Sequence, residues 1–267
     1  MIRLQELEET IQATLFTAHL EGERPGSLLV VADFEMAKSE TVVQFGNNDG
    51  VLCLTDFTAF GVTKKYLPDL IDGRIHHFII PDLMIPLSKS RETTNSTVGF
   101  LTALTEEGVR EITTYNFPDG LKLPRPVKAG VIAAIATPDF DRRRGEWAHD
   151  GFLSRFLPFS YSYDSATVDC VFGAILAGIP LSNPFKLQFP PKPQHVDVPQ
   201  EISRALETTA RSMGMGLGMH GFRPLKHLIR LAKGRALSRR RTAVTAEDRD
   251  WTLTMGRYFN FSRNTLT

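Results

Sequence analysis

The sequence predicts an α/β protein in which helices cover a parallel β-sheet and an all-helical segment follows. Short apolar runs at residues 28–31, 51–54, 77–80 and 131–136 are separated by longer polar or amphipathic stretches. This alternation is typical of a parallel sheet with helices on its faces. A proline-rich stretch from Pro180 to Pro199 cannot be helical, and the pattern beyond it is helical.

The remaining elements follow from periodicity and turn signals. Leu4, Leu7, Ile11 and Leu15 recur at helical spacing and predict a helix over residues 3–20. The turn sequence 116–120, flanked by 110–115 and 121–123, predicts a hairpin over residues 112–123. We therefore divide the chain into an N-terminal helix (1–26), an α/β core (27–180), a linker (181–198) and a helical C-terminal part (199–267).

Composition restricts the class of protein. The chain has 267 residues, of which 42% are hydrophobic, so it is long enough for one large domain or two. Cys53 and Cys170 have no paired spacing, which favours a reducing compartment and predicts neither a disulfide framework nor a zinc site. The N-terminus is acidic and amphipathic, unlike a signal peptide, and the apolar runs are too short to span a bilayer. We expect a cytoplasmic protein with no membrane contact.

Charge is distributed unevenly along the chain. Residues 201–267 contain 13 Lys and Arg but only 5 Asp and Glu, whereas residues 1–200 contain 18 and 25. A basic segment of this kind is what a surface for polyanions requires. A solvated helix face is the alternative explanation.

The stretch from Ala32 to Glu40 carries the most information about function. It follows an apolar strand and leads through Lys38 and Ser39 into a predicted helix. This is the context of a P-loop, in which backbone N–H groups cradle phosphates, Lys reaches the terminal phosphates and Ser holds Mg²⁺. Ala32 and Ala37 stand where a P-loop usually has glycine, so an ordinary helix start remains the alternative.

Four further residues occur in the order that phosphoryl transfer needs. Asp82 ends one apolar strand and Thr137 ends another, while Arg155 and Arg223 follow later in the chain. An Asp can hold the hydrated Mg²⁺, a Thr hydroxyl can orient a water, and an Arg can stabilise the charge of the transition state. Each residue alone has an ordinary structural explanation; the ordered set favours a nucleotide site.

These segments resemble the minichromosome-maintenance (MCM) helicases. Ala32–Glu40 is similar to their P-loop G-D-P-x-x-A-K-S-Q, and 129–138 is similar to their sensor strand. Ser154-Arg155-Phe156 resembles their arginine-finger motif S-R-F-D, and 222–232 and 244–248 resemble their lid helices. The resemblance implies an AAA+ P-loop NTPase with a three-layer parallel-sheet core and a small C-terminal helical lid, of the shortened type that phages and other mobile elements carry.

The resemblance also implies roles for single residues. Ala37, Lys38, Ser39 and Glu40 would bind ATP, and Ser39 and Asp82 would hold Mg²⁺. Thr137 and Arg223 would sense the γ-phosphate, and Arg155 would reach the site of a neighbouring subunit. Lys122 and Arg125, on the hairpin, would contact DNA phosphates in a central pore.

One departure from the family concerns hydrolysis. The family has Asp-Glu where this chain has Asp82-Leu83, and the missing Glu would polarise the attacking water. Glu106, Glu107 and Asp56 are the candidate replacements, and we expect weak hydrolysis. The large N-terminal domain that encircles DNA in the family has no counterpart here.

Three functions are compatible with these observations. The first is an AAA+ ATPase that forms a ring or helical homo-oligomer, binds ATP between subunits and acts on DNA without sequence preference, as a replication or helicase core. The second is an ATP-dependent switch or adaptor that hydrolyses poorly and assembles with a partner replication or mobile-element protein. The third is a scaffold that keeps the fold and binds no nucleotide.

Overall fold

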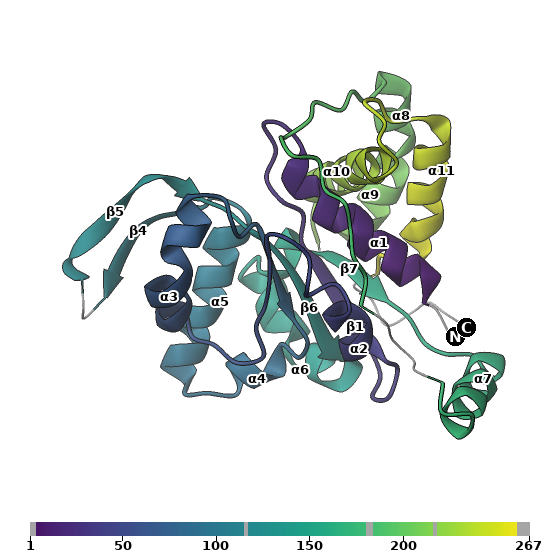
Figure 1. The fold of residues 1–267 in the computed structure, drawn as a ribbon, viewed down its shortest axis with the longest axis horizontal. Helices are drawn as coiled ribbons and strands as arrows, with labels where there is room; N and C mark the ends of the chain where they lie inside the picture. Colours follow the sequence, from purple (N-terminus) through teal and green to yellow (C-terminus); the bar gives the residue numbers. More distant parts are fainter. Residues whose placement is uncertain (1–3, 115–116, 180–183, 216–217, 261–267) are drawn as a thin grey trace.

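A computed structural model describes residues 4–114, 117–179, 184–215 and 218–260, and it contains a five-stranded parallel sheet (Figure 1). The strands are β1 (Leu28–Ala32), β2 (Val51–Cys53), β3 (His77–Ile80), β6 (Gly130–Ala136) and β7 (Leu157–Ser160), in the spatial order β2–β3–β6–β1–β7. The four predicted strands and their parallel pairing are confirmed. The fifth strand, β7, was not predicted.

The composition of β7 explains why it was missed. Pro158 interrupts the apolar run, and a proline normally argues against a strand because it cannot donate to the ladder. In the structure β7 is an edge strand paired only with β1, with Pro158 opposite Leu29. The central strands β1, β3 and β6 are buried along their whole length, as their continuous apolar runs predict.

Helices cover both faces of this sheet and give three layers. On one face α1 (Gln5–Phe16), α2 (Lys38–Val43) and α10 (Phe222–Ser238) pack on the side of β1 that carries Leu28 and Val30. On the other face α3 (Ala59–Ile71), α5 (Arg91–Thr105) and α6 (Thr137–His149) enclose a second core around Leu29 and Val31. Alternate residues of one strand therefore stabilise two separate layers of helices.

The predicted hairpin is present, with a shifted turn. Strands β4 (Val109–Thr114) and β5 (Phe117–Val127) pair antiparallel and project from the body of the protein (Figure 1). Residues 117–120, which were predicted as a turn, belong to β5. The other predicted turn residue, Asn116, lies outside the described residues, as does residue 115.

The C-terminal helices do not stand apart as a lid. These helices are α8 (Gln200–Ala205), α9 (Glu207–Met215), α10 and α11 (Ala246–Met255), and α10 packs directly against α1 in the core that also holds β1. The described part of the predicted linker, residues 184–198, is a packed strap. Its Gln194 exchanges backbone hydrogen bonds with His19 and Glu21, and its Phe189 stacks on His19. The segment that was expected to separate the core from the lid therefore packs against the N-terminal part of the protein.

The uneven charge of the sequence is neutralised inside the fold. The basic C-terminal helices pair with acidic residues near the N-terminus: Arg230 and Lys233 with Glu23, Arg235 with Glu9, and Arg257 with Glu6. Arg239 and Arg241 pair with Glu247 on α11. The basic run predicted as a surface for polyanions is thus largely occupied by intramolecular partners.

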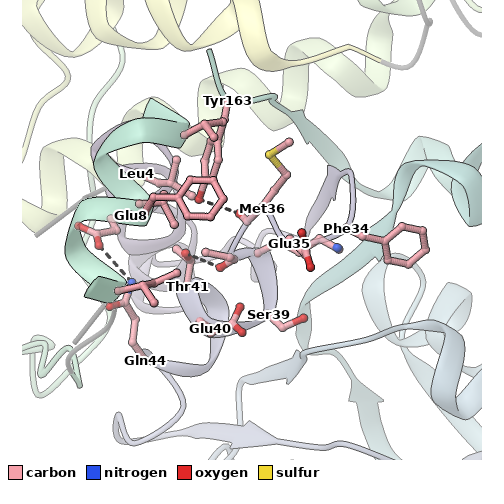
Figure 2. Close-up of a pocket in the computed structure, with 16 residues that line it drawn as sticks. Leu4, Glu8, Phe34, Glu35, Met36, Ser39, Glu40, Thr41, Gln44 and Tyr163 are labelled. Atoms are coloured by element: carbon pink, nitrogen blue, oxygen red, sulfur yellow. Dashed lines mark hydrogen bonds between the residues drawn. The ribbon is translucent and has the colours of Figure 1, made fainter. Parts of the chain in front are cut away.

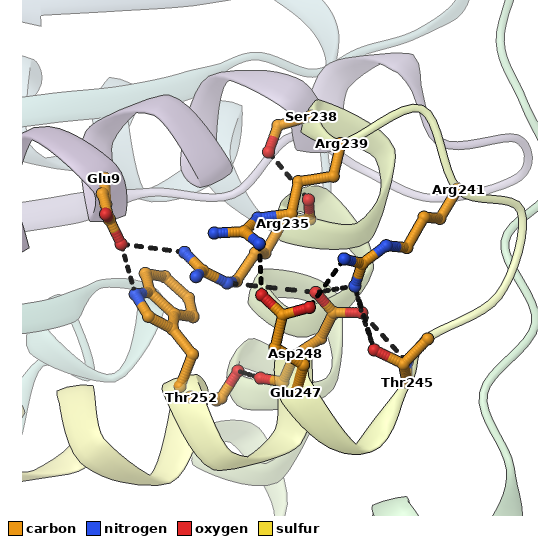
Figure 3. A network of polar contacts seen from close by, with 10 residues as sticks. Glu9, Arg235, Ser238, Arg239, Arg241, Thr245, Glu247, Asp248 and Thr252 are labelled. Atoms are coloured by element: carbon orange, nitrogen blue, oxygen red, sulfur yellow. Dashed lines mark hydrogen bonds and ion pairs between the residues drawn. The ribbon is translucent and has the colours of Figure 1, made fainter.

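Arg235 is the centre of this network (Figure 3). Its side chain is buried, and Nη1 donates to Glu9 Oε2 at 2.9 Å, while the guanidinium lies 4.1 Å from the centre of the Trp251 ring. Trp251 Nε1 donates to the same Glu9 oxygen at 2.7 Å. A single carboxylate on α1 therefore satisfies donors from both α10 and α11.

Replacing Glu9 should destabilise the fold because it leaves two buried donors without their acceptor. We expect Glu9→Ala to lower the free energy of unfolding by about 3 kcal/mol in urea denaturation. Glu6→Ala is the matched control: the Glu6–Arg257 pair is solvent-exposed at 3.4 Å, so its loss should cost less than about 1 kcal/mol. Equal losses in the two variants would contradict the central role of Glu9.

Candidate functional site

The loop between β1 and α2 presents a row of free backbone donors. Glu35 and Ala37 have φ values of 63° and 51°, in the left-handed region that favours glycine. Among the described residues, no backbone N–H from Phe34 to Glu40 donates a hydrogen bond. Successive N–H groups around left-handed residues form a concave nest that binds anions. The loop therefore has the backbone of a phosphate site without its glycines.

Two tyrosines hold this loop in place, of which Figure 2 shows Tyr163 beside Met36. The hydroxyl groups of Tyr161 and Tyr163 both donate to the carbonyl oxygen of Met36, at 2.5 and 3.0 Å. Burial raises the pKa of both phenols, so both remain protonated donors. The tyrosines follow β7, and the alternating Ser-Tyr-Ser-Tyr of residues 160–163 is the sequence signal that was overlooked.

Lys38 and Ser39 occupy the positions that a phosphate site needs. In the free protein Lys38 Nζ donates to the Asp33 carbonyl at 3.1 Å and lies 5.6 Å from the centre of the exposed Phe34 ring. Ser39 Oγ donates to the Pro81 carbonyl at 2.8 Å. This bond ties the start of α2 to the end of β3, directly beside Asp82.

Asp82 and Thr137 lie at the same edge of the sheet as the loop. Strand β6 runs between β1 and β3, so Thr137, at the end of β6, is placed between the loop after β1 and Asp82 after β3. Asp82 Oδ1 accepts the backbone N–H of Met84, the first residue of the short helix α4 (Met84–Leu87), at 2.9 Å. Its other carboxylate oxygen and the Thr137 hydroxyl make no hydrogen bond within the described chain.

The donor set at this edge suits a hard cation. A hydroxyl and a carboxylate are ligands that Mg²⁺ accepts, and this ion usually takes its other ligands from water and substrate phosphates. The Ser39 hydroxyl keeps its lone pairs because it donates to Pro81, and Asp82 keeps one free oxygen. The described residues contain no group of three His, Cys, Asp or Glu side chains suited to a metal. Ser39 and Asp82 thus fit Mg²⁺ only when a phosphate completes the set.

A cleft beside the loop has the size of a small-molecule site. It measures about 590 Å³ and lies between the loop, the start of α1 and helix α7 (Ser165–Leu176) (Figure 2). Its walls combine apolar side chains such as Leu4 and Phe172 with the polar side chains of Lys38, Thr41 and Gln44. This mixture is common in pockets for cofactors and nucleotides.

Arg155 and Arg223 lie together at the opposite edge of the sheet. Arg155 precedes β7, whereas the loop follows β1, and the two strands are parallel. Arg223 Nη1 donates to Ser154 Oγ at 2.6 Å, which joins the start of α10 to the residue before Arg155. Arg223 therefore lies at the edge away from Lys38 of its own chain, and its role as a sensor of the γ-phosphate stays a prediction. Its partners are Ser154 and, at 3.9 Å, Glu106.

Glu106 and Glu107 also lie at that opposite edge, so within one chain they are not placed beside Asp82, and their catalytic role stays a prediction. Glu106 forms an ion pair with Arg24 and lies 3.9 Å from Arg223, and Glu107 pairs with Arg155 at 3.3 Å. Burial opposes ionisation of Glu106, but the hydrogen bond and charge of Arg24 hold its pKa below the ordinary value. Both carboxylates act as partners of arginines, away from their own Asp82.

Burial shapes the charge state of this arginine cluster. It lowers the pKa of Arg155, against the opposing charge of Glu107, and the Nε of Arg155 is buried without a hydrogen-bond acceptor. Burial also lowers the pKa of His227 to about 3, so this ring is neutral beside Arg230 and contacts the Ser154 carbonyl. At least one buried donor of this cluster, Arg155 Nε, therefore has no hydrogen-bond acceptor.

The structure offers a different carboxylate for the missing Glu. Leu83 is fully buried in the core around α5 and α6, so its position cannot present a side chain to the site. Asp56 follows the edge strand β2 and forms an ion pair with Lys89 at 2.9 Å. Asp139 lies in the first turn of α6, two residues after Thr137, and its ion pair with the exposed Arg142 is loose at 3.4 Å. Sequence reasoning did not consider Asp139.

The predicted DNA contacts lie far from the loop, along β5. Lys122 is exposed, and Arg125 Nη2 donates to the Ile71 carbonyl at 2.7 Å, which fixes the base of the hairpin against α3. Lys122 has no ion pair within the described residues. Of the two predicted DNA contacts, only Lys122 therefore has no bond to another described residue.

A function for this chain can be inferred only from its own residues and their arrangement. No protein-family model and no curated protein matches this chain. Within the described residues, none of the helices combines the length and the apolar character needed to cross a bilayer. The resemblance to MCM helicases therefore stays an expectation from the sequence motifs alone.

The left-handed Ala37 gives a direct test of the loop geometry. Because a Cβ atom disfavours this conformation, Ala37→Gly should raise the free energy of unfolding by about 0.5–1 kcal/mol. Ala103→Gly, in the interior of α5, is the matched control and should lower it by about 1 kcal/mol. Chemical denaturation of the two variants measures both values. Destabilisation by both would show that Ala37 is not left-handed in solution.

Proposed function

We propose that this protein binds a nucleoside triphosphate, ATP, with Mg²⁺ at the edge of the sheet formed by the ends of β1, β3 and β6. The observation that carries the proposal is the run of unpaired backbone N–H groups from Phe34 to Glu40. Lys38 and Ser39 lie at its end, and Asp82 and Thr137 follow the two neighbouring strands. Donors, cation and carboxylate converge where ligands bind in open α/β sheets.

Each residue has a role that follows from its contacts. The nest and Lys38 neutralise the phosphates once the ammonium leaves the Asp33 carbonyl. Ser39 and Asp82 hold Mg²⁺, which would offset phosphate charge when bound. The Thr137 hydroxyl orients a water near the terminal phosphate, and the cleft of about 590 Å³ has room for the base and ribose.

The arginine pair supports an AAA+ type of assembly. Arg155 and Arg223 lie at the edge opposite to the loop, which supports a role at the nucleotide of a neighbouring subunit. Cations supplied in trans stabilise the charge of phosphoryl transfer. This arrangement favours a homo-oligomeric ATPase over a scaffold that binds no nucleotide.

Action on DNA is the first candidate for the biological role, and a switch that assembles with a partner protein is the second. The projecting hairpin with the free Lys122 favours DNA. The neutralised basic run at the C-terminal end and the absent Walker B glutamate favour the switch. The two roles differ in whether nucleic acid binds at all.

Lys38→Ala tests the nucleotide site. Removing the charged contact should weaken binding of a fluorescent ATP analogue at least about tenfold, since a charge-assisted contact contributes about 1.5–3 kcal/mol. Lys64→Ala removes an exposed lysine on α3 and is the matched control, with binding unchanged. Equal affinities in wild type and Lys38→Ala would refute the proposed site.

Asp139→Asn tests the origin of the residual hydrolysis. A positioned carboxylate contributes about 10²–10⁴-fold to such a step, so the amide variant should lose most of the steady-state phosphate release while still binding ATP. Asp56→Asn, which removes a carboxylate held by Lys89, is the comparison variant in the same assay and should keep the wild-type rate. If Asp139→Asn releases phosphate at the wild-type rate, Asp139 is not the base that activates the attacking water.

Salt dependence distinguishes the two roles. If Lys122 contacts phosphates, DNA affinity measured by fluorescence anisotropy should fall steeply with salt, and Lys122→Ala should reduce the slope of log K against log salt by about 1. Arg239→Ala removes a cation already paired with Glu247 and should leave the slope unchanged. Absence of DNA binding at low salt would favour the partner-protein switch.

A further inference from the structure

Helix α7 carries apolar side chains that no other part of the described chain covers. The helix projects from the body of the protein after β7 (Figure 1), and Ala174 is its only buried residue. Phe172 and Leu176 are 62% and 87% exposed. Proteins rarely expose clustered apolar side chains of this kind unless a partner covers them. The exposed apolar residues lie three or four positions apart, as on one side of a helix, and form what we call the α7 surface: Val168, Phe172, Ile175, Leu176 and Ile179.

Exposed carboxylates border the α7 surface. Asp164 is the residue before the helix, and Asp169 lies in it three positions before Phe172, which places the two side chains next to each other. Glu35 and Glu40, from the loop after β1 and from α2, line the same cleft as Phe172. None of the four carboxylates has an ion pair within the described residues.

Positive charge is scarce beside the α7 surface. Residues 161–179 contain no Lys, Arg or His. Among the described residues that line the cleft next to α7, Lys38 is the only Lys or Arg. The α7 surface is therefore apolar with an acidic border, and a matching partner has an apolar side and a positively charged border.

Two other kinds of partner match this surface poorly. Helices that lie in the membrane interface carry Lys or Arg that attract anionic lipids, whereas residues 161–179 contain neither. The acidic border would also repel anionic headgroups. A contact of the α7 surface with the same surface of a second copy would bring two acidic borders together, and like charges across an interface oppose binding. A basic partner avoids both conflicts.

We propose that the α7 surface binds a basic amphipathic helix of another protein. Phe172 and Leu176 contact the apolar side of that helix, as anchors three or four positions apart do when two helices meet. Asp164, Asp169 and Glu35 attract the Lys and Arg side chains along its edges. The biological meaning of this contact rests on the proposed role as a switch with a partner protein, whereas the contact itself needs no nucleotide.

A pair of synthetic peptides tests the chemistry of the partner. Both peptides form amphipathic helices with the same leucine side; one carries lysine at its polar positions and the other carries glutamate. In isothermal titration calorimetry the lysine peptide should bind at least about tenfold more tightly, because only lysine complements the carboxylates beside α7. Equal affinities for the two peptides, or no binding of the lysine peptide at its highest attainable concentration, would overturn the proposal.

Variants of exposed residues locate the contact. Leu176→Ser removes an apolar anchor without adding charge and should weaken binding of the lysine peptide at least about tenfold. The double variant Asp164→Asn with Asp169→Asn keeps the side-chain acceptor that caps α7; it should lower the affinity about threefold and make it less sensitive to salt. Phe60→Ser on α3 and Glu92→Gln on α5 are the matched controls and should bind as wild type. Wild-type affinity in Leu176→Ser would place the peptide elsewhere and refute the assignment.

Two further measurements compare the proposed partner with a lipid surface and with a second copy. Wild-type protein should not sediment with vesicles of phosphatidylcholine and phosphatidylserine. Any self-association seen in analytical ultracentrifugation should persist in Leu176→Ser. Vesicle binding that Leu176→Ser abolishes would assign the α7 surface to lipid, and self-association that this variant abolishes would assign it to a second copy. Either result would overturn the proposal.

Nucleotide binding is measured separately, so the two proposals can fail independently. If the wild type binds the lysine peptide through Leu176 but binds no ATP, the α7 contact stands and the nucleotide site is refuted. If it binds ATP through Lys38 but not the lysine peptide, the nucleotide site stands and the α7 contact is refuted.

Discussion

The packing of α1 between the sheet and α10 is the constraint on which the rest of the fold depends. The two helices approach so closely that a Cβ at Gly234 of α10 would lie 2.1 Å from the Ala13 carbonyl oxygen of α1. The acidic residues of α1 then meet the arginines of α10 and α11, and Glu9 alone accepts from Arg235 and Trp251. Without α1, one face of the sheet and the basic helices would both lose their cover.

This packing also determines what the C-terminal helices can do. A lid that opens and closes over a nucleotide needs a separate core, but α10 shares its core with α1 and β1. Its first residues are held at the amino edge of the strands by the bond from Arg223 to Ser154. The helices are therefore fixed to the body, and Arg223 lies beside Ser154 at this edge, away from its own loop.

Hydrogen bonds from other segments hold the loop after β1 in a conformation that usually requires glycine. Alanine at φ 51° carries a conformational cost of about 1–2 kcal/mol. The hydrogen bonds from Tyr161 and Tyr163 to Met36, and the bond from Ser39 to Pro81, hold the loop from two neighbouring segments. A conformation that glycine would adopt freely is here imposed by tertiary contacts, which is typical of strained backbone at functional sites.

Local patterns predicted the parts of the structure that local interactions determine. The strands at β1, β3 and β6 are long apolar runs, and the capping box at Thr245 and Asp248 is a short-range signal, so both were predictable. The edge strand β7 was missed because Pro158 makes it look like a loop. The pairing of Glu106 with Arg24 joins residues 82 positions apart, and no periodicity reports such a contact.

The placement of Arg155 shows that local sequence patterns also fail to predict how the candidate site residues are arranged. Its motif could be recognised in the sequence, but its distance from Lys38 depends on the order of the strands and on the direction of β7. Parallel strands place all residues that precede them at one edge and all residues that follow them at the other. Lys38, Asp82 and Thr137 follow strands of this sheet, while Arg155 precedes β7. The order and direction of the strands therefore decide which of the predicted site residues can act together within one chain.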